Sequence, residues 1–334
     1  MPVLLSLLSA CSINGSYLDS PNPDAAKLRY VSNNESATLD LFDDAHCDGR
    51  TTGMLNNLFL ADTKRRADMI VPPLPGAGSY YEFRLEPGQP VHVRAGTADA
   101  STLCGVSFTL TPQAGSEYEL SFDKTPGHCT ALLTRLQRVD GKDQRTAYPM
   151  VNTIPPACVG KSPLFPGPFT PLPDTAERTA LIDSIIHASI PPAAAHLESL
   201  SAQAATMRIR PAMQMAARKR ALSFEMPESY WQQYSQNLDS YVEALAQLDQ
   251  RAFKRFEREN QDYMRSVSTE LLKVWAGKGG DASVRERRIK GMRTFYDYVL
   301  QQTRAQIDLD YLRSMADLDR REGVCERYAG CWKL

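Results

Sequence analysis

The chain has 334 residues with 38 basic and 39 acidic side chains, a formal net charge of −1 and a pI near 6.5. This balance gives no electrostatic reason to expect a nucleic-acid partner. The length exceeds one typical core and predicts two domains, and no segment after residue 11 is apolar for the 18 or so residues that a spanning helix needs.

The chain opens with an apolar run that begins at Val3 and ends in Leu8-Ser9-Ala10-Cys11. These residues resemble the lipobox that closes the signal peptide of a Gram-negative bacterial lipoprotein. The resemblance rests on residues 8–11. It implies removal of residues 1–10 and a lipid anchor on Cys11 with acyl chains such as palmitate. Ser12 follows the cysteine instead of an aspartate, which by the same resemblance implies the outer membrane, with the protein facing the periplasm.

The predicted leader departs from the usual pattern in its charge. A secretory leader begins with a basic region, whereas no Lys or Arg precedes Cys11. We expect an upstream in-frame start codon to supply basic residues, and stop codons immediately upstream would count against it. The alternative is that residues 1–10 form a buried strand or short helix. Residues 11–24 are rich in turn-forming side chains and are expected to be a tether.

Cysteine usage agrees with an oxidising compartment, because assigning Cys11 to the lipid leaves six, an even number. Disulfides persist in the periplasm and are rare in the cytosol. Gly330 permits a backbone reversal between Cys325 and Cys331, so these two are expected to pair. The other four allow three connectivities: Cys47, Cys104, Cys129 and Cys158. Among these we favour Cys104 with Cys129. The alternative is six free thiols in a cytosolic protein.

Residues 25–152 alternate apolar and polar side chains between turn signals, which is typical of half-buried strands. Strands are expected at residues 28–31, 37–42, 81–85, 91–94, 106–110, 118–122 and 130–136. Turns are expected at Asp48-Gly49, Pro75-Gly76, Pro87-Gly88 and Ala114-Gly115. Residues 106–122 are expected to form a hairpin. Short strands at this spacing predict an antiparallel β-sandwich domain.

The composition changes at residues 153–173, where seven prolines lie between Pro155 and Pro173. This stretch is expected to be a semi-rigid linker or an arm laid over one domain. From 174 to 322 the apolar period is helical. Asp174 with Glu177 has capping-box spacing, and Pro191 ends the first helix. Further helices are expected at 193–207 and 211–224.

Two long helices are expected to dominate this C-terminal domain. One would begin at Pro227 and run to about residue 276, and the other would cover 282–322. The short Gly-rich connection between them predicts an antiparallel helical hairpin, with an aromatic stripe in its core or in a coiled-coil seam. The expected fold is therefore α+β in two domains, an N-terminal antiparallel β-sandwich and a C-terminal all-α domain. A tail, 323–334, would carry the last disulfide.

Few residues carry a recognisable chemistry. His46-Cys47 and His128-Cys129 join metal-binding residue types, but adjacent strand residues point to opposite faces and oxidised cysteines supply no thiolate. Gly160-Lys161-Ser162 ends like a phosphate-binding loop, yet it lies in the proline-rich stretch instead of between a strand and a helix. We therefore predict no catalytic residue, no metal and no cofactor.

Charged clusters are the other candidates. The acidic pairs are Asp43-Asp44 and Asp308 with Asp310, and the basic clusters are Arg208-Arg210, Arg218-Lys219-Arg220 and Arg285-Arg287-Arg288. Such clusters are typical of solvated faces, with an anionic lipid or an acidic partner as the alternative for the basic ones.

Two function classes remain. The favoured one is a non-enzymatic, membrane-anchored envelope lipoprotein that acts through protein binding or as a structural component. Immunity or inhibitor lipoproteins and accessory subunits of envelope complexes belong to this class. Its partner would be an unidentified envelope protein or a second copy of the chain, and no nucleic acid. The alternative is a periplasmic hydrolase whose active groups form no sequence motif. Titratable side chains converging in a closed cleft would favour the hydrolase, and an exposed apolar patch along the hairpin would favour binding.

Overall fold

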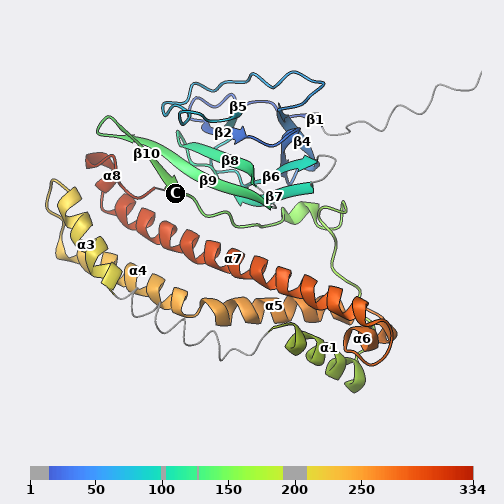
Figure 1. The fold of residues 1–334 in the computed structure, drawn as a ribbon. Helices are drawn as coiled ribbons and strands as arrows, with labels where there is room; N and C mark the ends of the chain where they lie inside the picture. Colours follow the sequence, from blue (N-terminus) through green and yellow to red (C-terminus); the bar gives the residue numbers. More distant parts are fainter. Residues whose placement is uncertain (1–14, 99–102, 126–127, 191–208, 334) are drawn as a thin grey trace, which may run out of the picture. The chain divides into compact units, whose positions relative to one another are not determined.

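The computed structural model describes residues 15–98, 103–125, 128–190 and 209–333 (Figure 1). It has mixed α and β content, with two five-stranded sheets and, among these residues, seven α-helices in a mainly helical C-terminal region. The chain divides into two compact units, residues 1–167 and 168–333, called here the β unit and the helical unit. In the described helices, none combines the length and the apolar character needed to cross a membrane. Cys11 and the helix expected at 193–207 lie outside the described residues.

The two sheets make up most of the β unit. The first has the order β1 (Gly15–Ser16), β4 (His46–Leu55), β3 (Ala37–Asp43), β6 (Val91–Ala98) and β7 (Leu103–Leu110). The second has the order β10 (Lys142–Ala147), β9 (His128–Val139), β8 (Glu117–Thr125), β2 (Ala26–Ser32) and β5 (Ser79–Leu85). Each of the seven predicted strand ranges lies within one of these strands.

Three details of the β prediction are wrong. β7 and β8 belong to different sheets, so residues 106–122 form no hairpin. The sheets are mixed, because β2 pairs with β8 in parallel and β1 pairs with β4 in parallel. The turn expected at Asp48-Gly49 lies inside β4. Gly49 has φ +82°, and a Cβ there would lie 2.5 Å from the Phe42 ring, so this glycine makes room for a side chain on the neighbouring strand.

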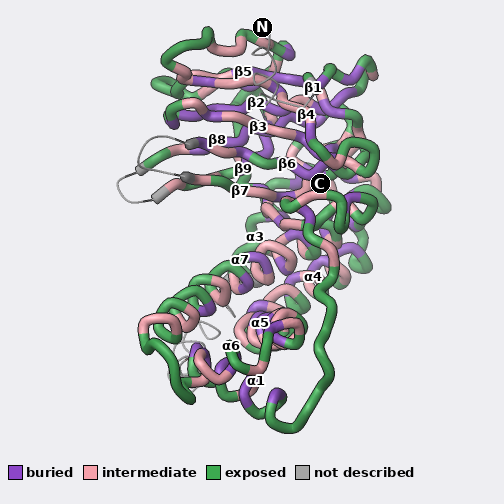
Figure 2. The backbone as a smooth tube through the Cα atoms, turned by 90° about the vertical axis from the view of Figure 1, so that its right-hand side faces the viewer, coloured by how far each residue is buried: buried purple, intermediate pink, exposed green. Residues whose placement is uncertain are grey.

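Apolar side chains from both sheets fill the interior of the β unit, and Figure 2 shows the strands largely as buried or intermediate segments. The first sheet contributes Leu39, Leu41, Val93 and Phe108, and the second contributes Leu28, Tyr30, Phe83 and Leu120, all fully buried. The two sheets contact each other where the hydroxyl oxygens of Tyr81 and Thr52 lie 2.7 Å apart.

Three disulfides are present, which confirms the prediction that the chain contains disulfide bonds. They join Cys47 to Cys158, Cys104 to Cys129 and Cys325 to Cys331. The first connects the proline-rich stretch to β4, and Phe165 from the same stretch packs edge-on against Phe42, with ring centroids 5.3 Å apart. Residues 156–167 therefore lie on the β unit as an arm.

The helical unit contains α1 (Ala176–Ser189), α3 (Ile209–Ala221), α4 (Glu228–Ala246), α5 (Leu248–Arg265), α6 (Thr269–Trp275), α7 (Ala282–Arg321) and α8 (Val324–Arg327). The prediction of a single helix from 227 to 276 is wrong. The structure has three helices there, α4, α5 and α6, separated at Gln247 and at residues 266–268. Ser268 ends the second interruption by accepting a hydrogen bond from the Leu271 amide as the N-cap of α6. The predicted cap at Asp174 is also displaced, since Thr175 caps α1.

The 40-residue helix α7 packs against α5 and α4 in the opposite chain direction. Phe256 of α5 meets Tyr296 of α7 with ring centroids 5.5 Å apart, and Tyr241 of α4 stacks on Tyr311 at 4.3 Å. Later residues of α7 thus contact earlier residues of α4 and α5. The aromatic stripe is part of this interior.

Candidate functional site

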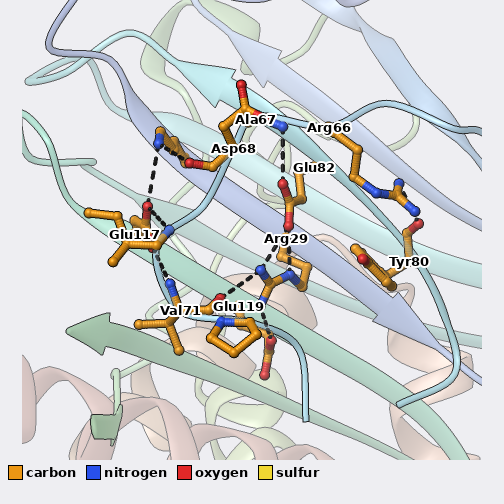
Figure 3. A network of polar contacts seen from close by, with 12 residues as sticks. Arg29, Arg66, Ala67, Asp68, Val71, Tyr80, Glu82, Glu117 and Glu119 are labelled. Atoms are coloured by element: carbon orange, nitrogen blue, oxygen red, sulfur yellow. Dashed lines mark hydrogen bonds and ion pairs between the residues drawn. The ribbon is translucent and has the colours of Figure 1, made fainter. Parts of the chain in front are cut away.

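Three charged side chains lie side by side across β5, β2 and β8. The strand register places Arg29 opposite Glu82 on one neighbour and opposite Glu119 on the other. The Arg29 guanidinium donates to both carboxylates at 2.9 Å and to the Val71 carbonyl at 2.8 Å (Figure 3). Arg29 is 1% exposed. The alternation of apolar and polar residues along these strands predicts that Arg29, Glu82 and Glu119 face solvent. The sequence analysis therefore missed this buried charge cluster.

A connecting segment, residues 65–72, covers this cluster and is called here the strap. The Ala67 amide donates to Glu82 at 3.0 Å, and the Ile70 amide donates to Glu117 at 2.8 Å (Figure 3). Carboxylates of the sheet therefore satisfy backbone donors of the strap. Because its charged groups already have protein partners, the network is a structural clamp.

Near its start, the connection that contains the strap has three exposed apolar residues, Leu58, Phe59 and Leu60, called here the apolar loop. Their exposed fractions are 77%, 92% and 62%. Single exposed apolar side chains are common on proteins, whereas three in succession call for a functional reason. Sequence reasoning did not single out this loop, because an apolar triplet is normally buried and only the tertiary structure shows its exposure.

A pocket of about 650 Å³ lies in the β unit, and its lining includes Tyr17, Asp43, Arg50, Glu86 and His92. Arg50 donates to Asp43 at 2.7 Å, and His46 Nδ1 lies 2.7 Å from the same carboxylate. Burial acts to raise the pKa of Asp43, but these hydrogen bonds and charges hold it below its usual value. Burial lowers the pKa of His92, whose Nδ1 donates to the Thr153 carbonyl at 3.1 Å. These partners give Asp43 and His92 structural roles.

A second buried charge cluster lies in the helical unit. Asp319 of α7 is fully buried and accepts hydrogen bonds from Arg218, from the Tyr230 hydroxyl at 2.9 Å and from the Trp332 amide at 2.6 Å. These contacts tie α3, α4 and the C-terminal tail to α7. Among the described residues, Asp319 and the two cysteines of the tail also have a spacing suitable for a metal ion. The cysteines are bonded to each other, so they supply no thiolate ligand.

The two halves of α7 differ in how their charges are compensated. In the C-terminal half, each arginine has a carboxylate partner, in the pairs Arg304–Asp308, Arg313–Asp310, Arg320–Asp317 and Arg321–Glu322. In the N-terminal half, Arg285, Arg287, Lys290 and Arg293 are exposed, and within the described part of the chain none of them forms an ion pair. Arg287 donates to the Ser283 hydroxyl and Arg293 to the Ser189 carbonyl, both at 3.0 Å. These four side chains are called here the basic surface.

Arg288 belongs to the same cluster in the sequence but has a different environment. Its guanidinium lies 5.1 Å from the centroid of the Tyr263 ring and 4.6 Å from that of Trp275, and it donates to Asn260 at 3.2 Å. Burial lowers its pKa. Arg288 therefore fixes α7 against α5 and α6, and the exposed charge comes from its neighbours.

The remaining predicted candidates lie apart from one another or have structural partners. Asp308 accepts from the Tyr241 hydroxyl at 2.7 Å, and Asp310 accepts from Gln306 at 2.8 Å. The Gly160 amide donates to the Phe165 carbonyl within the arm. His196 and Arg208 lie outside the described residues. Comparison with protein-family models, with curated proteins and with solved structures finds no match.

Proposed function

We propose that the chain is a non-enzymatic lipoprotein of the outer membrane, anchored through Cys11, that faces the periplasm and binds an acidic segment of another envelope protein. The lipobox-like residues 8–11 support the anchor, and the three disulfides agree with an oxidising compartment. In this proposal the two sheets form a β-sandwich domain that follows the tether in the chain. Helices α4 to α7 form an antiparallel hairpin domain that meets the partner.

The basic surface of α7 is the observation that carries the binding role. Arg285 lies in the first turn of α7, where a positive charge opposes the helix dipole. No ion pair among the described residues compensates the four cations, whereas the other half of the same helix is fully paired. Hydrogen bonds to Ser283 and Ser189 account for the positions of Arg287 and Arg293, but they leave the positive charges without a paired carboxylate. An acidic partner would supply the missing charge, accelerate association and select the binding register.

The test places a photo-crosslinking amino acid at Thr294, an exposed residue of α7 beside the basic surface. Crosslinking in the native envelope should yield an adduct to a protein segment rich in Asp and Glu. Reversing three charges, Arg285→Glu, Arg287→Glu and Lys290→Glu, should lower the adduct yield roughly tenfold, because several modest charge pairs are replaced by repulsions. A higher salt concentration should also lower the adduct yield of the unmodified chain, because salt screens the charge pairs.

The matched control reverses three charges in the compensated half of the same helix, with Arg313→Glu, Arg320→Glu and Arg321→Glu. This variant has the same net charge as the first, and its adduct yield should stay close to that of the unmodified chain. Equal losses in the two variants would show an effect of net charge alone. An adduct that persists after reversal of the basic surface, or one made only with lipid or with a second copy of this chain, would contradict the proposal.

A further inference from the structure

The apolar loop lies at the tip of a tight return of the chain after β4. The Thr63 amide donates to the Met54 carbonyl at 3.0 Å, and the Met54 amide donates to the Thr63 hydroxyl at 2.9 Å. Residues 62 and 63 therefore run back beside the end of β4. The exposed side chains of Leu58, Phe59 and Leu60 occupy the tip between these two segments.

Two asparagines hold the base of this return. The Asn57 side-chain oxygen accepts from the amides of Phe59 and Leu60, both at 2.8 Å. The Asn56 side chain donates to the carbonyls of Ser32 and Asn34 at 2.8 and 2.9 Å, which ties the loop to the end of β2. These hydrogen bonds fix the backbone of the loop in a conformation in which its three apolar side chains are exposed.

The position of the loop along β4 relates it to the N-terminus. β1 pairs in parallel with β4, with Gly15 opposite Arg50. From Arg50 to Leu55, where β4 ends, the strand covers about 17 Å. Only residues 12–14 separate Cys11 from Gly15, and a chain of that length spans at most about 14 Å. Because β1 runs parallel to β4, a lipid on Cys11 would attach near the Arg50 end of this edge of the first sheet, and the apolar loop lies beyond the opposite end of β4, after Leu55.

Neighbouring side chains on this edge fit a lipid surface. Leu18, which follows β1, is also 78% exposed. Lys64 and Arg66 are exposed and follow the loop in the sequence. Apolar side chains flanked by basic residues are the combination that binds the interface of an anionic bilayer.

We propose that Leu58, Phe59 and Leu60 insert into the surface of an anionic lipid bilayer and form a second membrane contact in addition to the acyl anchor, at the other end of the same sheet edge. The inference rests on the proposed lipoprotein function, because the anchor is what brings this edge to the membrane. A single acyl chain binds a membrane only marginally, and a second contact adds to its hold. Two contacts along one edge would also restrict the orientation of the β unit on the membrane.

The test uses the mature chain with Cys11→Ser, which carries no acyl anchor, and measures its co-flotation with lipid vesicles. The vesicles contain phosphatidylethanolamine with phosphatidylglycerol, and vesicles of phosphatidylcholine alone serve for comparison. We expect binding to the anionic vesicles, reduced by Phe59→Asp at least about tenfold. Binding to phosphatidylcholine should be weaker for the unmodified loop. Because no sample carries an acyl chain on residue 11, the outcome does not depend on whether Cys11 is acylated in the cell.

Leu132→Asp provides the matched control, since Leu132 is a 51% exposed leucine of β9 outside the loop. Its vesicle binding should equal that of the parent chain. The far-UV circular dichroism and the melting temperature of both variants should be unchanged, because both side chains are already exposed. Binding that survives Phe59→Asp, or a parent chain that binds neither vesicle, would overturn the inference. So would a photo-crosslinker at Phe59 that forms adducts with a protein instead of lipid in the native envelope.

Discussion

Replacing Arg29 with methionine should destabilise the β unit by about 3–5 kcal/mol, because it leaves the buried carboxylate of Glu82 without its counter-ion and that of Glu119 with only Arg145, at 3.6 Å. The guanidinium donates to both carboxylates and to the strap, and it is 1% exposed. Peptide-resolved hydrogen exchange under native conditions measures this change, since it reports the stability of the two units separately. Protection should fall in β2, β5, β8 and the strap.

Two further variants define the cause of that loss. Arg138→Met removes an exposed ion pair with Asp143 on the same sheet and should leave the protection of the β unit close to that of the unmodified chain, because solvent screens the pair. Adding Glu82→Gln and Glu119→Gln to Arg29→Met removes the two buried carboxylate charges and should recover part of the stability. A change below about 1 kcal/mol for Arg29→Met itself would show that the cluster does not hold the strap as described.

Replacing Asp319 with asparagine should destabilise the helical unit by a similar amount, about 3–5 kcal/mol, because the buried charge of Arg218 then has no carboxylate partner. Asp319 is fully buried and also accepts from Tyr230 and from the amide of Trp332. Hydrogen exchange should therefore accelerate in α3, in the C-terminal half of α7 and in the tail.

The control for this variant is Asp310→Asn, which removes an exposed carboxylate from the same helix and should change stability by less than about 1 kcal/mol. Arg29→Met and Asp319→Asn also serve as controls for each other, because each changes a different unit. Each compact unit has its own interior, so Arg29→Met should leave protection in α7 unchanged, and Asp319→Asn should leave β2 unchanged. Loss of protection in both units from either substitution would mean that the chain unfolds as one cooperative body.

Local periodicity was enough to place the seven expected strands and the helix at 282–322, because alternation and helical spacing depend on neighbouring residues. The pairing of strands that are distant in the sequence could not be predicted from local patterns. The parallel pairing of β2 with β8 and the assignment of β7 and β8 to different sheets depend on contacts across the whole unit. The interruption at Gln247 has no proline or glycine to mark it, so the pattern on either side predicted one continuous helix.

The candidate surfaces were predictable only in part, and for a similar reason. The basic cluster Arg285-Arg287-Arg288 was visible in the sequence, but its division into exposed cations and a stacked Arg288 depends on the rings of Tyr263 and Trp275. The charge cluster around Arg29 requires the register of three strands and a strap that covers them. The exposure of Phe59 depends on a return of the chain that Asn56 and Asn57 stabilise.

Membrane retention of the Cys11→Ser variant tests the central claim, that this is a lipid-anchored protein of the envelope. The unmodified chain should incorporate labelled palmitate and stay in the outer-membrane fraction after an alkaline carbonate wash. The variant should incorporate no label and leave that fraction in the wash, because the apolar loop alone gives only a weak, reversible contact. Retention of the variant equal to that of the unmodified chain, with no palmitate on either, would contradict the claim.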